Sequence, residues 1–175
     1  FVAGLPIVKD LSLNFGITKM IEEAGHTPGT KGIKIRTESA SPSMAADLEI
    51  EEGSTVVVVE RVRTQDGRPI VWSVNTIPLE RVGKNALEEF KPETESLYEY
   101  YASTLRMNIA YGNAELLPVA ATAQLAAILE VRKGFPLMRI TQTDYDANNL
   151  PILHSVDYHI PGLYKFIVKR KGPNW

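Results

Sequence analysis

The stretch from Ser54 to Pro78 constrains the fold most, because it has the pattern of two strands that pair with each other. Its first run, up to Arg63, is rich in β-branched residues, which favour strands. Thr64-Gln65-Asp66-Gly67 follows as a turn, and a second apolar run returns from Pro69 to about Ile77. The pattern predicts an antiparallel β-hairpin.

The type of turn decides which side chains share a face of this hairpin. If Thr64 to Gly67 is a type I turn with Gly67 as a left-handed bulge, Ser73 and Asn75 lie on the face that carries the arginines. The pairs are then Arg63 with Pro69, Arg61 with Val71 and Val59 with Ser73. A plain two-residue turn at Asp66-Gly67 would shift the pairing by one residue and send Ser73 and Asn75 to the opposite face. We favour the bulged turn, because glycine is usual at the fourth position of a type I turn.

Arg61 and Arg63 share a face in either register, because side chains alternate along a strand. A guanidinium group can bind a phosphate or a carboxylate through two parallel hydrogen bonds. The pair therefore favours a small anionic ligand. A purely structural role remains open at this point, with edge arginines that lie over apolar neighbours or pair with acids elsewhere.

The sequence pattern around the hairpin occurs twice. Ala45 to Gly53 aligns with Ala126 to Gly134, and Pro69 to Ser73 aligns with Pro151 to Ser155 when the second turn has one extra residue. The repeated unit is a short helix, a glycine, a strand, a turn and a returning strand, which predicts an α+β fold with a pseudo-symmetric sheet. Arg61 and Arg63 correspond to Gln142 and Asp144, so an anion site would belong mainly to the first copy.

Composition narrows the function further. The 175 residues fit one domain, and the absence of cysteine excludes a disulfide scaffold and a thiolate metal site. The three histidines are scattered, and no nucleophile elbow, P-loop or dinucleotide fingerprint occurs, so we predict no metal, no cofactor and no enzymatic activity. A net charge of −2 argues against a nucleic-acid surface on this chain. No apolar run reaches the roughly 20 residues of a membrane span.

Other segments have weaker signals. Phe1 to Leu13 has no stable period and is interpreted as a linker or an arm. Thr18 can cap a short helix that ends near Ala24, and Ser96 lies near the start of an amphipathic helix that ends at about Arg106. The remaining predicted strands are Thr30 to Ala40, Asn108 to Val119, Phe135 to Asp144, Leu150 to Ile160 and Tyr164 to Lys169.

Several of these motifs together resemble a known family. They are Thr18 to Pro28, Ala45-Ala46-Asp47-Leu48 to Gly53, Arg61-Val62-Arg63 with Asp66-Gly67-Arg68-Pro69, Ile77-Pro78, Ser96-Leu97-Tyr98, and Asp144-Tyr145-Asp146 to Pro151. In this order and spacing, from about Leu11 to Phe166, the chain resembles the UTRA effector-binding domain of GntR-type bacterial transcriptional regulators of the HutC subfamily.

The resemblance implies a chorismate-lyase-like α+β fold, in which helices flank an antiparallel sheet. It implies that residues 13–170 form the effector-binding domain after a linker at 1–12, and that a winged helix-turn-helix domain precedes this chain. Such regulators are cytoplasmic homodimers in which a small metabolite changes operator binding. The implied partners are a sugar phosphate, an amino-acid catabolite or another small anion, a second copy of the chain, operator DNA through the missing domain, and no membrane.

The resemblance also implies the residues of the site. The paired arginines of the family match Arg61 and Arg63, its hydroxyls match Thr18 and Ser96, and an aromatic residue that covers the ligand matches Tyr158. Ser73 stands where many members have a glutamate, which would leave the site more positive and makes sugar-phosphate recognition doubtful. The last hairpin ends in Tyr158-His159-Ile160-Pro161 instead of the usual Tyr-Arg-x-Asp. The alternatives are a chorismate-lyase-like enzyme, by analogy of fold, and a dimerisation module without a ligand.

Overall fold

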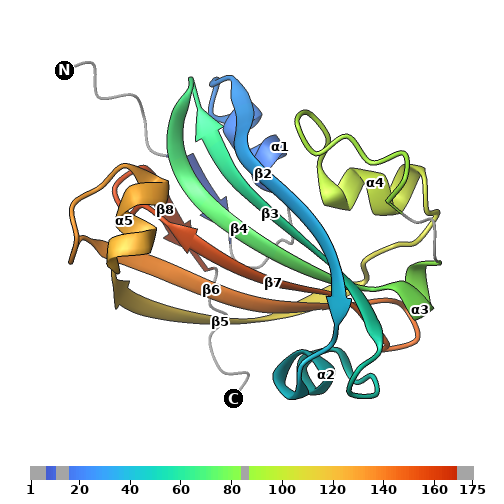
Figure 1. Ribbon diagram of the computed structural model, residues 1–175. Coiled ribbons are helices and arrows are strands. Elements are labelled where there is room, and N and C mark those ends of the chain that lie inside the picture. Colours follow the sequence, from blue (N-terminus) through green and yellow to red (C-terminus); the bar gives the residue numbers. More distant parts are fainter. Residues whose placement is uncertain (1–6, 11–15, 84–86, 169–175) are drawn as a thin grey trace, which may run out of the picture.

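The computed structural model describes residues 7–10, 16–83 and 87–168, and Figure 1 shows their arrangement. The elements in chain order are β1 (Ile7–Asp10), α1 (Ile17–Glu23), β2 (Pro28–Ser39), α2 (Pro42–Leu48), β3 (Thr55–Gln65), β4 (Arg68–Pro78), α3 (Leu79–Val82), α4 (Leu97–Ser103), β5 (Tyr111–Ala120), α5 (Ala123–Leu129), β6 (Pro136–Tyr145), β7 (Pro151–His159) and β8 (Tyr164–Ile167). The predicted α+β class is confirmed.

The main sheet has six strands in the order β2-β3-β4-β7-β6-β5, and every neighbouring pair is antiparallel. The first half of the chain supplies β2, β3 and β4, and the second half supplies the other three. The halves meet at β4 and β7, which lie side by side in Figure 1 as a green and a red strand. Val74 pairs with Val156 at the centre of this contact. The predicted duplication is therefore a structural one.

The two repeated helices begin and end in the same way. Ser41 accepts a hydrogen bond from the backbone N–H of Met44 at 3.3 Å, and Thr122 accepts one from Leu125 at 3.2 Å. Each hydroxyl pairs with one of the N–H groups that the first turn of a helix leaves without a partner. Each helix ends at a glutamate in the left-handed conformation, Glu49 and Glu130. The same local signals therefore mark the start and the end of both helices.

The hairpin of β3 and β4 differs from the predicted one in its turn. Asp66 and Gly67 both have positive φ, 49° and 81°, which defines a two-residue type I′ turn rather than the predicted bulged type I turn. An extra residue, Ile70, then enters β4, because Arg63 pairs with Val71 while Thr64 pairs with Pro69. Without this bulge, the two-residue turn would pair Arg61 with Trp72. The extra residue moves the pairing by one position, so Ser73 pairs with Arg61 and lies on the same face of the sheet. The predicted grouping on one face was right, but the predicted pairing was wrong by two residues.

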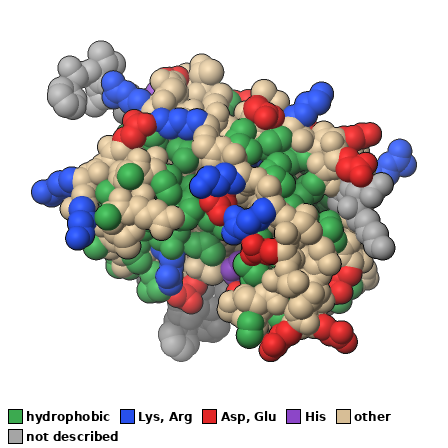
Figure 2. Space-filling model, in the orientation of Figure 1, with side chains coloured by type: hydrophobic (Ala, Val, Ile, Leu, Met, Phe, Trp, Pro, Cys, Tyr) green, Lys and Arg blue, Asp and Glu red, His purple; other side chains and the backbone are tan. Residues whose placement is uncertain are grey.

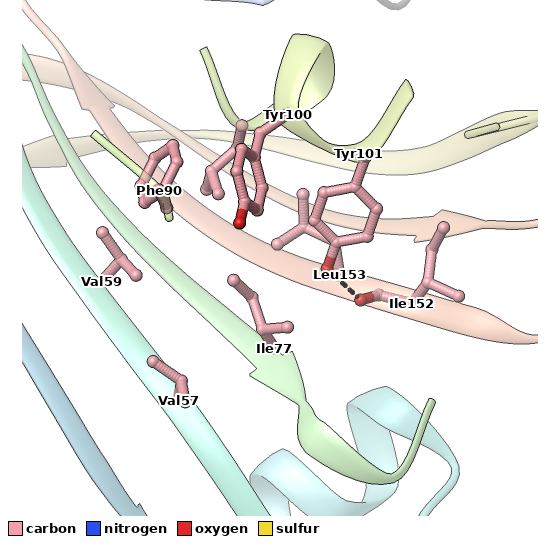
Figure 3. Packing of buried hydrophobic residues seen from close by; sticks show 9 residues of the cluster. Val57, Val59, Ile77, Phe90, Tyr100, Tyr101, Ile152 and Leu153 are labelled. Carbon is pink, nitrogen blue, oxygen red and sulfur yellow. Dashed lines mark hydrogen bonds between the residues drawn. The ribbon is translucent and has the colours of Figure 1, made fainter. Parts of the chain in front are cut away.

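Helices cover both faces of the sheet. On one face α2 packs over Val56, Val58 and Val74, and α5 packs over Trp72 and its neighbours. On the other face α4 covers a larger cluster, and Figure 3 shows Tyr100 and Tyr101 pointing from this helix toward the strands. The Tyr101 hydroxyl donates to the backbone carbonyl of Ile152 at 2.8 Å. The cluster consists of Val57, Val59, Ile77, Phe90, Leu97, Tyr100, Tyr101, Ile152 and Leu153.

A second, smaller cluster lies on the same face as α4. It joins Met20 and Ile21 of α1 to Ile70 and Val71 of β4. The sheet surface between the two clusters is polar. This arrangement places buried polar side chains between two apolar cores.

The segment predicted to be a linker or an arm contains a strand within its described part. β1 pairs in parallel with β8, and the register joins Ile7 to Tyr164 and Asp10 to Ile167. The alternation in four residues is too short to reveal a strand from sequence, and its partner lies at the opposite end of the chain. The predicted strand from Tyr164 ends at Ile167 in the structure, and residues 169–171 lie outside the described part.

The surface has a mixed charge. Figure 2 shows Lys and Arg side chains interspersed with Asp and Glu on the face seen in Figure 1, with hydrophobic side chains between them. Across the described ranges, no helix is long and apolar enough to cross a membrane.

Candidate ligand-binding site

A pocket lies where the first residues of α1 and α4 approach the centre of the sheet. Strands β3 and β4 of the first half and β6 and β7 of the second half contribute to its floor. Its lining consists of Gly16, Ile17, Thr18, Arg61, Arg63, Ser73, Asn75, Ser96, Leu97, Tyr98, Gln142, Leu153, Ser155 and Asp157. The pocket therefore lies across the junction between the two halves of the duplicated sheet.

Arg61 is buried at one side of this pocket, with only 6% of its surface exposed. Its Nη1 donates to the backbone carbonyl of Glu95 at 3.0 Å and to that of Pro92 at 3.4 Å, and its guanidinium lies 5.3 Å from the ring centre of Phe90. Burial, and next the charge of Arg63, lower the pKa of Arg61 to about 9. The group is charged at neutral pH, but its charge is poorly solvated. Its Nε has no hydrogen-bond partner among the described residues.

Arg63 is buried beside it and is held by two hydroxyl groups. Its Nη1 donates to Thr30 Oγ1 at 2.6 Å, and its Nη2 donates to Thr18 Oγ1 at 2.5 Å. Thr18 was predicted to cap α1, but the N-cap residue is Gly16. The Thr18 hydroxyl instead contacts the guanidinium, which couples the first turn of α1 to β3.

Four polar residues of β4 and β7 form the centre of the floor: Ser73, Asn75, Ser155 and Asp157. Ser73 pairs with Asp157 and Asn75 pairs with Ser155 across the two strands. Asn75 Nδ2 donates to Ser155 Oγ at 2.9 Å. Within the described part of the chain, Ser73 Oγ and Asn75 Oδ1 are buried without a hydrogen-bond partner. Buried polar atoms are nearly always paired, so these two atoms indicate a position for a ligand or an ordered water.

A hydrogen-bonded network adjoins the pocket on the second half of the sheet. The Tyr98 hydroxyl donates to Asp144 Oδ2 at 2.8 Å, and Gln142 Nε2 donates to Asp144 Oδ1 at 2.6 Å. Gln142 Nε2 also lies 2.9 Å from the Tyr98 hydroxyl. Asp144 is fully buried, so these donors hold its carboxylate in place and fix Tyr98 at the pocket wall.

The starts of α1 and α4 are in close contact. A β-carbon at Gly16 would lie 2.8 Å from Ser96 Oγ and 3.1 Å from the Tyr98 ring. Gly16 has a φ of −64°, so it is required here for space and not for backbone conformation. Ser96 is the N-cap residue of α4, which agrees with its predicted place near the start of a helix. Its hydroxyl makes no capping hydrogen bond.

The structure brings together five of the six residues that the sequence pointed to. Thr18, Arg61, Arg63, Ser73 and Ser96 all line the pocket. Tyr158 does not join them: its ring stacks on Trp72 at 5.6 Å between centroids, on the face that α5 covers. Residues 157 and 158 point to opposite faces of β7, so Asp157 takes the place in the pocket.

Sequence reasoning missed Asp157, Gln142 and Tyr98 as parts of one site. The duplication contained the signal for Asp157. The alignment of Ser73 with Ser155 places Asp157 at the position equivalent to Asn75, on the arginine face. An acid therefore lines the pocket although Ser73 stands where many members of the family have a glutamate.

The pocket has no obvious metal-binding chemistry. Within the described ranges, no group of three or more histidine and acidic side chains is placed to hold a metal ion.

Both arginines lie on β3, which has β2 on one side and β4 on the other, so they are not the edge arginines of the structural alternative. Two buried guanidinium groups facing a cavity are suited to bind an anion.

Sequence comparison relates the chain to one family and to longer proteins. The sequence model of the UTRA domain matches residues 23–165. The HTH-type transcriptional repressor NagR of Bacillus subtilis is 28% identical over 155 residues, which is 87% of this chain and 63% of that protein. The HTH-type transcriptional regulator Rv0792c of Mycobacterium tuberculosis is 26% identical over 171 residues, 96% of this chain and 62% of that protein. The chain thus spans less than two thirds of the length of each.

Solved structures have the same fold. The effector domain of PhnF from Mycobacterium smegmatis superposes with a TM-score of 0.84 at 20% identity. The match covers 95% of this chain and all of that domain. At this level of identity the likeness concerns the fold alone.

Proposed function

This chain belongs to the UTRA domain family, and from that premise we propose that it is the ligand-sensing domain of a GntR-type transcriptional regulator of the HutC subfamily. Its pocket binds a small anionic metabolite. Thr18, Arg61, Arg63, Ser73 and Ser96 contact this ligand, and Asp157 joins them. Tyr158 is left out of the proposed site because its ring packs under α5.

The observation that carries the proposal is the pair of buried guanidinium groups at the pocket. Arg61 and Arg63 are 6% and 3% exposed, and they lie two residues apart on one strand face. Two like charges in such a place cost free energy, because burial and mutual repulsion both disfavour the charged form. An anion between them would offset this cost. The Arg61 Nε–H is a donor for that anion, because it has no other acceptor in the described part of the chain.

The ligand regulates DNA binding through a domain that precedes this chain. Two relatives named as HTH-type regulators are longer than this chain, which supports a winged helix-turn-helix domain upstream. The coupling runs through α1: an anion that binds Arg63 competes with the Thr18 hydroxyl for the same guanidinium. The first turn of α1 would then shift, and α1 is the helix nearest the upstream domain in sequence. Such coupling is a difference in ligand affinity between two conformations.

The regulator functions as a homodimer in the cytoplasm, where its DNA partner lies. Strands β2 and β5 form the two edges of the main sheet and carry exposed apolar side chains, including Ile35 at 46% and Leu117 at 39%. Unpaired strand edges favour association with another copy of the chain. Light scattering of the purified protein at micromolar concentration tests this part: a monomer would contradict it.

Calorimetric titration tests the anion pocket. We would titrate the 175-residue chain with inorganic phosphate, glucose 6-phosphate and succinate, and follow the same ligands by thermal unfolding. A ligand at about 100 times its Kd stabilises the fold by about 2.7 kcal/mol. Arg61→Ala should weaken binding at least tenfold, because it removes a buried charge-assisted contact. Arg68→Ala is the matched control, since it removes an exposed arginine on the same hairpin.

The alternatives give different results in the same experiments. A chorismate-lyase-like enzyme would convert chorismate to 4-hydroxybenzoate, whereas the relatives are named as transcriptional regulators. A dimerisation module without a ligand would show no stabilisation by any anion in either protein. Binding that Arg61→Ala leaves unchanged would overturn the proposed site.

A further inference from the structure

The pocket that contains the two arginines is also lined by Asn75 and Asp157, whose side chains carry acceptor oxygens. We propose that its ligand is a compact zwitterion that places an anionic group on Arg61 and Arg63 and an ammonium group on Asn75 and Asp157. This inference rests on the proposed function and specifies the chemical class of the ligand. Three observations support it: a buried acceptor oxygen on Asn75, the charges of the side chains that line the pocket, and the alignment of Arg61, Ser73 and Asp157 across three neighbouring strands.

The buried acceptor of Asn75 is the first observation. Asn75 is 7% exposed, and its Nδ2 donates to Ser155 Oγ at 2.9 Å. Its Oδ1 therefore faces away from Ser155 and has no donor among the described residues. An anionic group cannot satisfy this oxygen. A ligand that fills the pocket must bring a donor to it, because a buried acceptor without a donor costs about 1–3 kcal/mol.

The carboxylate of Asp157 is the second observation. Asp157 lines the pocket beside Asn75, and its charge raises the pKa of Arg61 against the larger effect of burial. The negative charge therefore acts inside the same cavity as the guanidinium groups. A second negative charge placed near Asp157 would be repelled, whereas an ammonium group would be attracted.

The sum of charges favours a ligand that carries both signs. Of the residues that line the pocket, Arg61, Arg63 and Asp157 are the charged ones, which gives the lining a net charge of +1. A phosphate monoester with two negative charges would leave this buried site with an excess of −1. The same ester with an ammonium group has a net charge of −1 and balances the site. A simple carboxylate also balances the charge, but it brings no donor to Asn75 and Asp157.

The spacing requires a compact ligand. Arg61 pairs with Ser73, and Ser73 pairs with Asp157, so the three residues form a row across β3, β4 and β7. Neighbouring strands lie about 4.8 Å apart, which puts the outer two Cα atoms roughly 10 Å apart. The side chains fill part of this span. A separation of two or three carbon atoms between the anionic group and the amine is sufficient.

Matched probes test the inference, because they differ only in the group that would reach Asn75 and Asp157. The 175-residue chain is titrated with propyl phosphate, 2-hydroxyethyl phosphate and 2-aminoethyl phosphate, and separately with butyrate and β-alanine. Inorganic phosphate serves as a reference anion. We expect 2-aminoethyl phosphate to bind about tenfold tighter than propyl phosphate, with 2-hydroxyethyl phosphate between them, because charged hydrogen bonds are the stronger ones. β-Alanine should gain less over butyrate, because it has no net charge and leaves the lining with an excess of +1.

Asp157→Asn should remove most of the preference for the amine while the affinity for propyl phosphate is unchanged or higher. Glu52→Gln is the matched control, because it removes one negative charge from an exposed turn outside the pocket. Thermal unfolding of both variants verifies that they fold, and the ranking of the probes on the unchanged chain does not depend on them.

The outcomes separate this inference from the proposed function. Equal affinity for the amine and methyl probes, abolished by Arg61→Ala, would overturn the zwitterion and leave the anion pocket intact. A preference for the amine that Asp157→Asn does not reduce would also overturn it. If neither the probes nor inorganic phosphate bind, the anion pocket and the zwitterion fall together.

Discussion

Ser73 and Asp157 lie directly opposite each other on β4 and β7, at the junction of the two halves of the sheet. Ser73 also pairs with Arg61 on its other side. The serine therefore separates a buried guanidinium from a carboxylate. A larger acidic side chain at this position would reach both groups, and the small one leaves space between them.

The first prediction concerns this space. Ser73→Glu should lower the affinity for inorganic phosphate about tenfold or more, because the new carboxylate would lie next to Arg61 and take the place of the anion. Ser73→Gln has the same size without the charge, so it serves as the control and should weaken binding less. Calorimetric titration of the three proteins measures the difference. Equal loss in both variants would mean that size, and not charge, decides the effect.

Thr18→Val should destabilise the fold. The variant keeps the shape of the side chain but removes the oxygen that accepts the Arg63 Nη2 hydrogen bond at 2.5 Å. Because Arg63 is 3% exposed, water cannot readily replace this acceptor, and we expect a loss of about 1.5–3 kcal/mol. Urea unfolding gives the value, and Thr18→Ser, which retains the hydroxyl, should lose less. Stability equal to the parent chain would contradict the assigned contact.

Gly16→Ala should force the starts of α1 and α4 apart. The added carbon would lie 2.8 Å from Ser96 Oγ, and the backbone at residue 16 is otherwise compatible with alanine. Overpacking of this kind costs about 1–3 kcal/mol. The double variant Gly16→Ala/Ser96→Ala lacks Ser96 Oγ and should recover part of the lost free energy of unfolding. Urea unfolding of the single and double variants measures this recovery in a double-mutant cycle. Purely additive effects would show that residues 16 and 96 do not press on each other.

Tyr101→Phe should change the stability at high pH. Burial raises the pKa of the Tyr101 hydroxyl above its ordinary value of 10.0, so the phenol ionises more readily in the unfolded chain. The unfolded state then loses its proton first, and folding stability falls as pH rises beyond 10, by at most about 1.4 kcal/mol per pH unit from this group.

The phenylalanine variant lacks this contribution, so its stability should fall less steeply above pH 10. At neutral pH the variant should be about 1–3 kcal/mol less stable, because the Ile152 carbonyl loses its donor. Urea unfolding at pH 8, 10 and 11 tests both effects. Parallel curves for the two proteins would contradict the assignment of the buried hydroxyl.

Much of this fold could be predicted because its signals are local or repeated. The hairpin around Asp66-Gly67 was evident from the sequence, and the duplication predicted the short helices before Gly53 and Gly134, which the structure contains as α2 and α5. The duplication also predicted a pseudo-symmetric sheet, although not that its halves join through β4 and β7. By contrast, β1 was missed because four residues carry little periodicity and their partner β8 lies at the other end of the chain.

The site was harder to predict than the fold, because it depends on which way single side chains point. The turn at Asp66-Gly67 was assigned to the wrong type, and the bulge at Ile70 restored the face of Ser73 by a second, independent shift. No local sequence signal marks that bulge. Tyr158 was selected by resemblance to the family, although alternation along β7 from Ser155 points to Asp157 instead.

The pseudo-symmetric sheet has a consequence for how a ligand is held. If the halves had stayed identical, the pocket at their junction would offer the same groups twice, and a ligand could bind in either of two orientations related by the local axis. Arg61 and Arg63 on one side and Gln142 and Asp144 on the other remove that degeneracy. A molecule with unlike ends would therefore meet different groups in its two orientations, and one of them would be favoured.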